Sequence, residues 1–174
     1  MNIRPALLPD FEAIYAIWLE GIAHSFAGFD YPADLHEQFH HNFAACRPPF
    51  GFWVAETDGK VVGWQSLLPC TSNPMKRHLL AESSTYVASG KQTRGVGEAL
   101  LRHALAQAGP MGLQFVFGYV LAGNERMAKL VQRCGFALAS DALTPRLPPF
   151  QSPKDLWIYT TGPISYDVVP PTTD

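Results

Sequence analysis

Apolar residues over Phe11–Trp18 recur every three or four positions, which is the spacing of one buried face of an α-helix. The same spacing recurs over Gly95–Ala108, and Gly109-Pro110 supplies a suitable end for that helix. Two shorter helices are expected over residues 33–45 and 124–134. The pattern therefore predicts four helices, separated by segments with a different periodicity.

These intervening segments have the composition and alternation of strands. Phe52–Glu56 alternates, Asp58-Gly59 is a hairpin turn signal, and Lys60–Leu67 follows as the return strand. Other strands are expected over residues 81–87, 113–121 and 155–159, with one more that starts at Phe136. Two helices and a hairpin, followed by strands that alternate with helices, predict an α/β (α+β) fold with helices packed on a sheet.

The composition excludes several functional classes. The 174 residues suit one domain, and a net charge of −2 provides no field that would attract nucleic acid or an anionic membrane. No apolar run reaches the roughly 18–20 residues of a membrane span. Three widely spaced cysteines argue against a disulfide framework and a CxxC metal site. The first residues lack the pattern of a secretory signal. We therefore expect a cytoplasmic protein.

The segment from Val87 to Gly97 (VASGKQTRGVG) carries the most information. A strand ends, a loop follows, and two glycines enter the first turn of a helix. Such a turn presents backbone N–H groups at the positive end of a helix dipole, which suits a phosphate or pyrophosphate. The GxxxxGK[ST] and GxGxxG nucleotide motifs do not fit, because Gln92 follows Gly90-Lys91 and Glu98-Ala99-Leu100 follows Gly97. On this pattern alone, the glycines could equally well ease helix–strand packing.

Two spaced motifs resemble those of the GNAT N-acetyltransferase superfamily. Gln92-x-x-Gly95-x-Gly97 is similar to the family's Gln/Arg-x-x-Gly-x-Gly/Ala motif, and it begins five residues after Val87. Downstream, the family's Asn-x5-Leu-x4-Gly-Phe pattern is matched by Asn124, which also suits a helix N-cap, and by Leu130 and Gly135-Phe136. The strand Glu82–Val87 (ESSTYV) resembles the Glu-x-Ser-x-Tyr-Val of the phosphinothricin/methionine sulfoximine acetyltransferase branch.

The resemblance implies a fold and a cosubstrate. It implies a single GNAT-type domain over residues 1–166, with a mixed central sheet of about six to seven strands flanked by about four helices, and a flexible tail over residues 167–174. It also implies that the loop and the helix start hold the pyrophosphate of acetyl-CoA, with no metal. The cofactor-binding residues implied are Val87, Ala88, Ser89, Gln92, Thr93, Arg94, Gly95, Val96, Gly97 and Asn124.

Acetyl transfer requires a neutral amine, and a primary amine with a pKa of roughly 8–10 arrives mostly protonated at pH 7. A carboxylate can remove that proton. Glu82 is the candidate base because it matches the family's position and because an ionisable group is unusual inside a strand. Alternatively, Glu82 is solvated at a strand end or paired with Arg77 or Lys76.

The other chemical roles follow from the resemblance. It implies an oxyanion donor in the backbone N–H of Val87 or Ala88. Many family members place a tyrosine general acid seven residues after the asparagine, where this chain has Val131. Tyr119 or Tyr86 could substitute, although core packing is the simpler role for both. A thiol with a pKa near 8.5 can also leave unaided as a thiolate.

The acceptor pocket is predicted from aromatic and cationic residues. Aromatic walls suit a small amphipathic substrate, and the resemblance places them in the loop between the first two helices. The substrate-binding candidates are Phe26, Phe29, Arg77 and Tyr86, with Tyr31, Trp64 and Trp157 as further walls or as ordinary core residues. His36, His40 and His41 have helical spacing, but a solvated helix face explains them better than a metal site.

Taken with the resemblance, the sequence predicts an acetyl-CoA-dependent N-acetyltransferase that acts on a small primary amine. The expected acceptor is an amino acid or an analogue of the phosphinothricin or methionine sulfoximine type. The alternatives are a non-catalytic acetyl-CoA-binding module and an acetyltransferase for a protein N-terminus or a polyamine. A homodimer is also expected, through sheet edges or through the apolar C-terminal strand Trp157–Tyr159.

Overall fold

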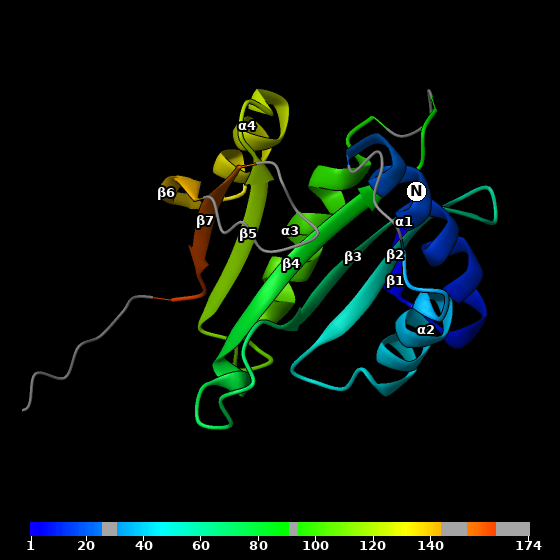
Figure 1. Ribbon diagram of the computed structural model, residues 1–174, viewed down its shortest axis with the longest axis horizontal. Helices are drawn as coiled ribbons and strands as arrows, with labels where there is room; N and C mark the ends of the chain where they lie inside the picture. The colour runs from blue at the N-terminus through cyan, green and yellow to red at the C-terminus, as the bar shows by residue number, and fades with distance from the viewer. Residues whose placement is uncertain (26–30, 91–93, 144–152, 163–174) are drawn as a thin grey trace, which may run out of the picture.

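The computed structural model describes residues 1–25, 31–90, 94–143 and 153–162. Figure 1 shows these residues folded into a twisted sheet with helices packed against it. Two short 3-10 turns, η1 (Leu8–Asp10) and η2 (Arg77–Leu79), precede α1 and β4. The helices are α1 (Phe11–Ser25), α2 (Leu35–Ala45), α3 (Val96–Ala108) and α4 (Glu125–Arg133). The strands are β1 (Asn2–Pro5), β2 (Gly51–Thr57), β3 (Lys60–Pro69), β4 (Leu80–Val87), β5 (Phe115–Leu121), β6 (Ala137–Leu143) and β7 (Lys154–Thr160).

The sheet has seven strands in the order β1-β2-β3-β4-β5-β7-β6. Among the described strands, the pair β4 and β5 is parallel, and the other neighbours are antiparallel. The prediction of a mixed sheet of six to seven strands with about four helices is therefore confirmed. The hairpin turn between β2 and β3 is also confirmed, because Asp58 and Gly59 both have positive φ angles, 53° and 72°.

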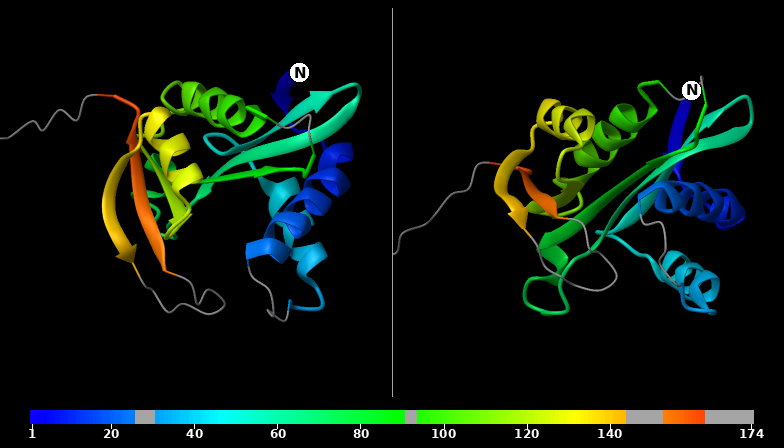
Figure 2. Two further views of the ribbon diagram at one scale, coloured as in Figure 1. Left: turned by 90° about the horizontal axis from the view of Figure 1, so that it is seen from above. Right: turned by 45° about the horizontal axis from the view of Figure 1, so that its top comes forward.

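Each face of the sheet carries one pair of helices (Figure 2). On one face, α3 and α4 cover a core that includes Leu100, Val116 and Trp157. On the other face, α1 and α2 cover a second, more aromatic core that includes Phe11 and Trp64. The sheet lies between the two cores, so the side-chain alternation along each strand decides which helix pair a residue contacts.

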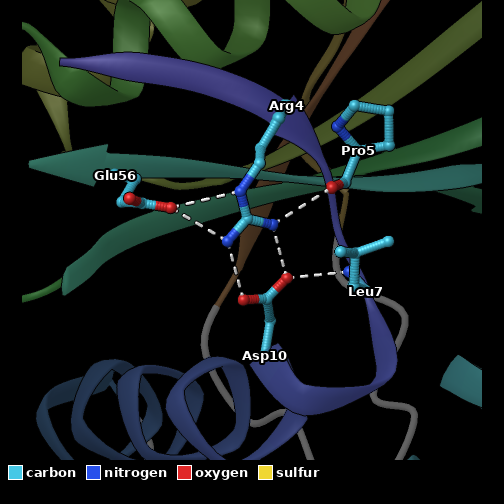
Figure 3. A network of polar contacts seen from close by, with 5 residues as sticks. All are labelled: Arg4, Pro5, Leu7, Asp10 and Glu56. Atoms are coloured by element: carbon cyan, nitrogen blue, oxygen red, sulfur yellow. Dashed lines mark hydrogen bonds and ion pairs between the residues drawn. The ribbon is translucent and has the colours of Figure 1, made fainter. Parts of the chain in front are cut away.

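The first strand was not predicted from the sequence, and a polar network explains how such a short strand is held (Figure 3). Arg4 of β1 donates to both carboxylate oxygens of Asp10 at 2.6 and 2.9 Å, and to Oε2 of Glu56 in β2. Asp10 in turn accepts the backbone N–H of Leu7 at 2.7 Å. The Arg4 guanidinium lowers the pKa of Asp10 through these hydrogen bonds. The network thus ties the start of α1 to the edge of the sheet.

Within the described parts of the chain, no helix combines the length and the hydropathy that crossing a bilayer requires.

Candidate active site

The central feature of the site is the divergence of the two parallel strands, visible in Figure 1. β4 and β5 are paired at Leu80–Phe115, Ala81–Val116 and Glu82–Phe117, at the start of both strands. β4 then continues to Val87 and β5 to Leu121 without further pairing to each other. An opening therefore begins beside Glu82 and widens toward the C-terminal ends of the two strands.

A cavity of about 510 Å³ occupies this opening. Its size falls within the range of a small-molecule site. β4 and β5 contribute its central walls, α1 and the segment before α2 one side, and α4 the other. The lining residues are Trp18, Ile22, Tyr31, Pro32, Leu35, Glu82, Ser83, Ser84, Thr85, Tyr86, Leu101, Gly118, Tyr119, Val120, Leu121, Asn124, Met127, Val131, Phe136 and Lys154.

Alternate residues of β4 face opposite sides of the sheet. Ala81 is fully buried in the core beneath α3, whereas Tyr86 packs with Trp64 in the core beneath α1. Strand alternation then places Glu82, Ser84 and Tyr86 on the α1 face. Glu82 consequently lies on the α1 side of the opening, at the point where β4 and β5 separate.

Glu82 is a partly buried carboxyl group. Burial raises its pKa, and the nearby positive charge of Lys154 partly opposes that rise. The charged neighbour that acts on this carboxyl group is therefore Lys154, and not Arg77 or Lys76 as the alternative interpretation suggested. Arg77 lies exposed in η2, and the described residues that line the cavity do not include it. The cation that contributes to the cavity is Lys154 of β7.

The register of β3 and β4 distinguishes the two proposed oxyanion donors. The N–H of Ala88 donates to the carbonyl oxygen of Val62 at 3.0 Å and is therefore occupied. Val87 stands opposite Gly63 in the same ladder. Because N–H groups along a strand alternate in direction, the N–H of Val87 is directed away from β3, toward the side from which β5 has diverged. Val87 is thus the better placed of the two donors.

The predicted glycine turn is built as a helix start. Gly95 is the N-cap of α3 with φ of +82°, a left-handed conformation that favours glycine. Gly97 follows in the first turn, and a Cβ at this position would lie 3.5 Å from Cγ2 of Val87. Glu98 also lies in this turn, but Arg102 and Arg133 bind its carboxylate at 2.9 and 3.0 Å. Its negative charge is therefore balanced at the helix end where an anion would bind.

A sequence model of the acetyltransferase (GNAT) family matches residues 12–136, well over half of the chain. The chain belongs to this family. YwnH of Bacillus subtilis (strain 168), provisionally named a phosphinothricin acetyltransferase, is 31% identical over 142 residues, which cover 79% of this chain and 84% of YwnH. The prediction of an acetyl-CoA-dependent acyltransferase is confirmed at the level of the family.

Solved structures share the fold. YncA of Salmonella typhimurium, provisionally named an acetyltransferase and solved with its cofactor acetyl-CoA, superposes with a TM-score of 0.80 at 21% identity, over 95% of this chain and 96% of YncA. A phosphinothricin acetyltransferase of the GNAT superfamily from Sinorhizobium meliloti, solved in complex with acetyl-CoA, gives a TM-score of 0.72 at 18% identity, over 98% of this chain and 96% of that chain.

The GNAT tyrosine position is occupied by a buried, apolar residue in this chain. Asn124 caps α4 as predicted, because its side-chain oxygen accepts the N–H of Met127 at 3.1 Å. Val131, seven residues on, lines the cavity from the same helix.

The prediction of core packing for Tyr119 is wrong, since this residue is 45% exposed and lines the cavity. Tyr86 is partly buried and stacks on Trp64, with ring centroids 4.9 Å apart.

The residues that line the cavity differ in part from the acceptor-binding residues predicted from the sequence. Trp64 and Trp157 are core residues, 2% and 8% exposed, and not cavity walls. Tyr31 lines the cavity as suggested, and Trp18, which helical spacing had marked simply as apolar, lines it from α1. Phe26, Phe29, Gln92 and Thr93 lie outside the described residues. Sequence reasoning missed Lys154 altogether, because nothing local connects this residue with β4.

The remaining predicted residues are placed as follows. Ser89 and Arg94 are exposed on either side of the undescribed part of the loop, and Val96 is buried under the start of α3. The backbone N–H of Ser89 lies 3.3 Å from a carboxylate oxygen of Glu20 in α1. His36 contacts Glu12 at 3.2 Å, and the described residues contain no cluster of three or more potential metal ligands.

Proposed function

We propose that the protein transfers the acetyl group of acetyl-CoA to the primary amine of a small acceptor, namely an amino acid or an analogue of the phosphinothricin or methionine sulfoximine type. The observation that carries this proposal is the position of Glu82. This partly buried carboxyl group lies on the α1 side of a cavity that opens between β4 and β5. The names of YwnH and of the S. meliloti structure support this acceptor class.

The residues around the opening are suited to acetyl-CoA, the proposed acetyl donor. The first turn of α3 offers backbone N–H groups at the positive end of its dipole, beside Gly95 and Gly97. Gly118 of β5 lines the cavity without a side chain, and a Cβ there would lie 3.5 Å from the ring of Phe136 and take up space beside the opening. When bound, acetyl-CoA supplies an activated thioester whose acetyl group passes to nitrogen, with release of the CoA thiol.

The acceptor is prepared by groups on the α1 face of β4. An acceptor ammonium that enters the cavity meets the Glu82 carboxylate, which takes one proton and leaves the amine nucleophilic. A raised pKa makes this carboxylate a stronger base than an exposed glutamate would be. The N–H of Val87 is directed toward the opening and would stabilise negative charge on the acetyl oxygen. No general acid is required, since a thiol with a pKa near 8.5 leaves as a thiolate.

Thiol release in the presence of acetyl-CoA and a panel of amines tests this proposal. The panel contains phosphinothricin, methionine sulfoximine, free amino acids, spermidine and a short peptide with a free N-terminus. We expect turnover with the first three groups, and mass spectrometry should show a product 42 Da heavier than the acceptor. Binding of acetyl-CoA without turnover of any amine would favour the non-catalytic module. Preferential turnover of spermidine or of the peptide would favour the two enzyme alternatives.

We also propose a cytoplasmic homodimer, and of the two predicted surfaces we retain a sheet edge. The apolar strand β7 lies inside the sheet, between β5 and β6, so it offers no free edge. The edge strand at this end is β6, where Leu138 is half exposed. A partner that pairs with β6 would cover this edge. Light scattering at tens of micromolar should give twice the mass of the chain, and a monomer there would reject the dimer.

A further inference from the structure

Three strands place Lys154 on the same face of the sheet as Glu82. Glu82 stands beside Phe117 of β5, and Phe117 stands opposite Ile158 of β7. Residues that stand side by side on neighbouring strands share a face. Lys154 lies four residues before Ile158, and side chains an even number of residues apart on a strand also share a face. Lys154 is therefore on the α1 side of the sheet, where the acceptor is proposed to bind.

The backbone positions of the two residues are well separated along the strand direction. Four residues of a strand correspond to about 13 Å along its axis, so Lys154 is set well toward the open end of the cavity relative to Glu82. Both residues nevertheless line the same cavity, and the charge of each opposes the shift that burial causes in the other's pKa. The two side chains thus approach the cavity from its inner and outer ends.

Lys154 and Glu82 are the two charged residues among the described residues that line the cavity. The rest of the lining is mainly aromatic, aliphatic or hydroxyl-bearing. Lys154 is partly buried, and this burial lowers the pKa of its ammonium group. A cation in such surroundings interacts with an anionic ligand more strongly than an exposed lysine does, because the effective dielectric constant is lower.

We propose that Lys154 binds an acidic group of the acceptor, a carboxylate or phosphinate, while Glu82 faces the amine of the same molecule. This inference rests on the proposed N-acetyltransferase function. It assigns to β7 the cation that the sequence suggested in the loop before β4, where Arg77 lies away from the cavity. An acceptor with an amine and an acid would span the two charges. A polyamine would place a second ammonium group near Lys154, and repulsion would disfavour it.

The test compares acceptors that differ only in their acidic groups. Methionine sulfoximine carries a carboxylate, its decarboxylated amine carries none, and phosphinothricin carries a carboxylate and a phosphinate. A charge-assisted hydrogen bond contributes enough that its loss corresponds to about 10- to 100-fold in affinity. We therefore expect Lys154→Met to raise KM for methionine sulfoximine by about that factor, with little change in KM for the amine or in affinity for acetyl-CoA. Lys154→Arg, which keeps the charge, should retain most of the affinity.

Lys129→Met is the matched control, because Lys129 lies exposed on α4 and pairs with Glu125 away from the cavity. If Lys154→Met does not fold, Lys154→Gln replaces it. An increase in KM confined to phosphinothricin would support the proposal and assign the phosphinate as the bound group. The proposal would be overturned if Lys154→Met changed KM equally for methionine sulfoximine and for its decarboxylated amine. It would also be overturned if the wild-type protein preferred the decarboxylated amine. Either result would leave N-acetylation itself intact. Absence of turnover with every amine would overturn both.

Discussion

A Cβ atom at Gly21 would lie only 2.6 Å from Cδ1 of Tyr86, so α1 passes directly over β4 with no space for a side chain between them. The ring of Tyr86 is not free to turn away, because it also stacks on Trp64. This contact sets the distance between α1 and the strand that carries Glu82. It also sets the width of the cavity on the acceptor side, since Trp18, Ile22 and Tyr86 all line it.

Gly21→Ala should therefore destabilise the protein. Glycine to alanine inside a helix ordinarily stabilises by up to about 1 kcal/mol, whereas overpacking a core costs about 1–3 kcal/mol. We expect the second effect to dominate, with a lower free energy of unfolding in urea. KM for the acceptor should rise while the affinity for acetyl-CoA stays close to wild type. A variant as stable as wild type would show that Tyr86 moves freely.

Gly97→Ala tests the pyrophosphate turn. The added Cβ would make ordinary contacts of 3.5 and 3.6 Å with Val87 and Thr85, so the free protein should keep its fold. A ligand that needs the bare backbone would meet the new methyl group. We expect a loss of about tenfold or more in affinity for acetyl-CoA by calorimetry, which corresponds to about 1.4 kcal/mol.

Gly109→Ala provides the matched control for this change. Gly109 follows the other end of α3, and its added Cβ would lie 3.6 Å from Cβ of Thr161, again an ordinary contact. Its affinity for acetyl-CoA should equal that of the wild type. Equal affinities for all three proteins would remove the assignment of the ligand to the start of α3.

The pair of Arg4 and Asp10 should make stability depend on pH. The pKa of Asp10 is lowered in the folded state, mainly by its hydrogen bonds with Arg4. The stabilisation is therefore fully present above the unfolded pKa of about 3.9 and is lost as the pH falls through the lower folded pKa. Asp10→Asn should reduce the free energy of unfolding by about 1–2 kcal/mol at pH 7, and this difference should shrink below pH 4.

Urea denaturation at several pH values measures this difference. Glu125→Gln is the control, because Glu125 forms an i,i+4 pair with Lys129 on the exposed face of α4. Exposed pairs of this kind contribute little, so this variant should follow the wild type at every pH. A constant difference between Asp10→Asn and wild type from pH 7 to pH 3 would argue that the carboxylate charge plays no part.

Local patterns predicted most of the elements, and the reason is their periodicity. The helices over Phe11–Ser25 and Val96–Ala108 present apolar faces at regular spacing, and Asn124 caps α4 through its own side chain. The strand Asn2–Pro5 was missed because it has four residues, contains a charged Arg4 and shows no clear alternation. Its stability comes from the distant residues Asp10 and Glu56, to which no local signal points.

The site shows the same division between local and long-range information. The Glu82, Gly95 and Gly97 positions follow from motifs within a short stretch of chain. Lys154 reaches the site only because β7 inserts between β5 and β6, a pairing that joins residues far apart in sequence. The N–H of Ala88 was one of two equal candidates until the register of β3 and β4 showed it bonded to Val62. Strand order and register are tertiary facts, and the alternation of residues does not determine them.

The role of Glu82 leads to the most direct kinetic prediction. General-base assistance typically accelerates a reaction by ~10²–10⁴-fold. Glu82→Gln keeps the size of the side chain but cannot accept the amine proton, so turnover at pH 7 should fall by about that factor. Affinity for acetyl-CoA should stay near wild type, because Glu82 lies on the α1 face of β4 and the proposed donor site lies at the start of α3. Glu37→Gln, an exposed carboxylate of α2, is the control and should not change turnover.

The pH dependence adds a second, independent signature of the base. Burial raises the pKa of Glu82, and only the ionised carboxylate accepts a proton. The acidic limb of wild-type kcat/KM should therefore lie above the ordinary glutamate pKa of about 4.3. In Glu82→Gln this limb should be absent, and activity should rise toward the amine pKa of roughly 8–10, where the acceptor is neutral without assistance. If the variant instead keeps wild-type turnover and the wild-type pH profile with a saturating acceptor, Glu82 only shapes the cavity and the acceptor loses its proton to water.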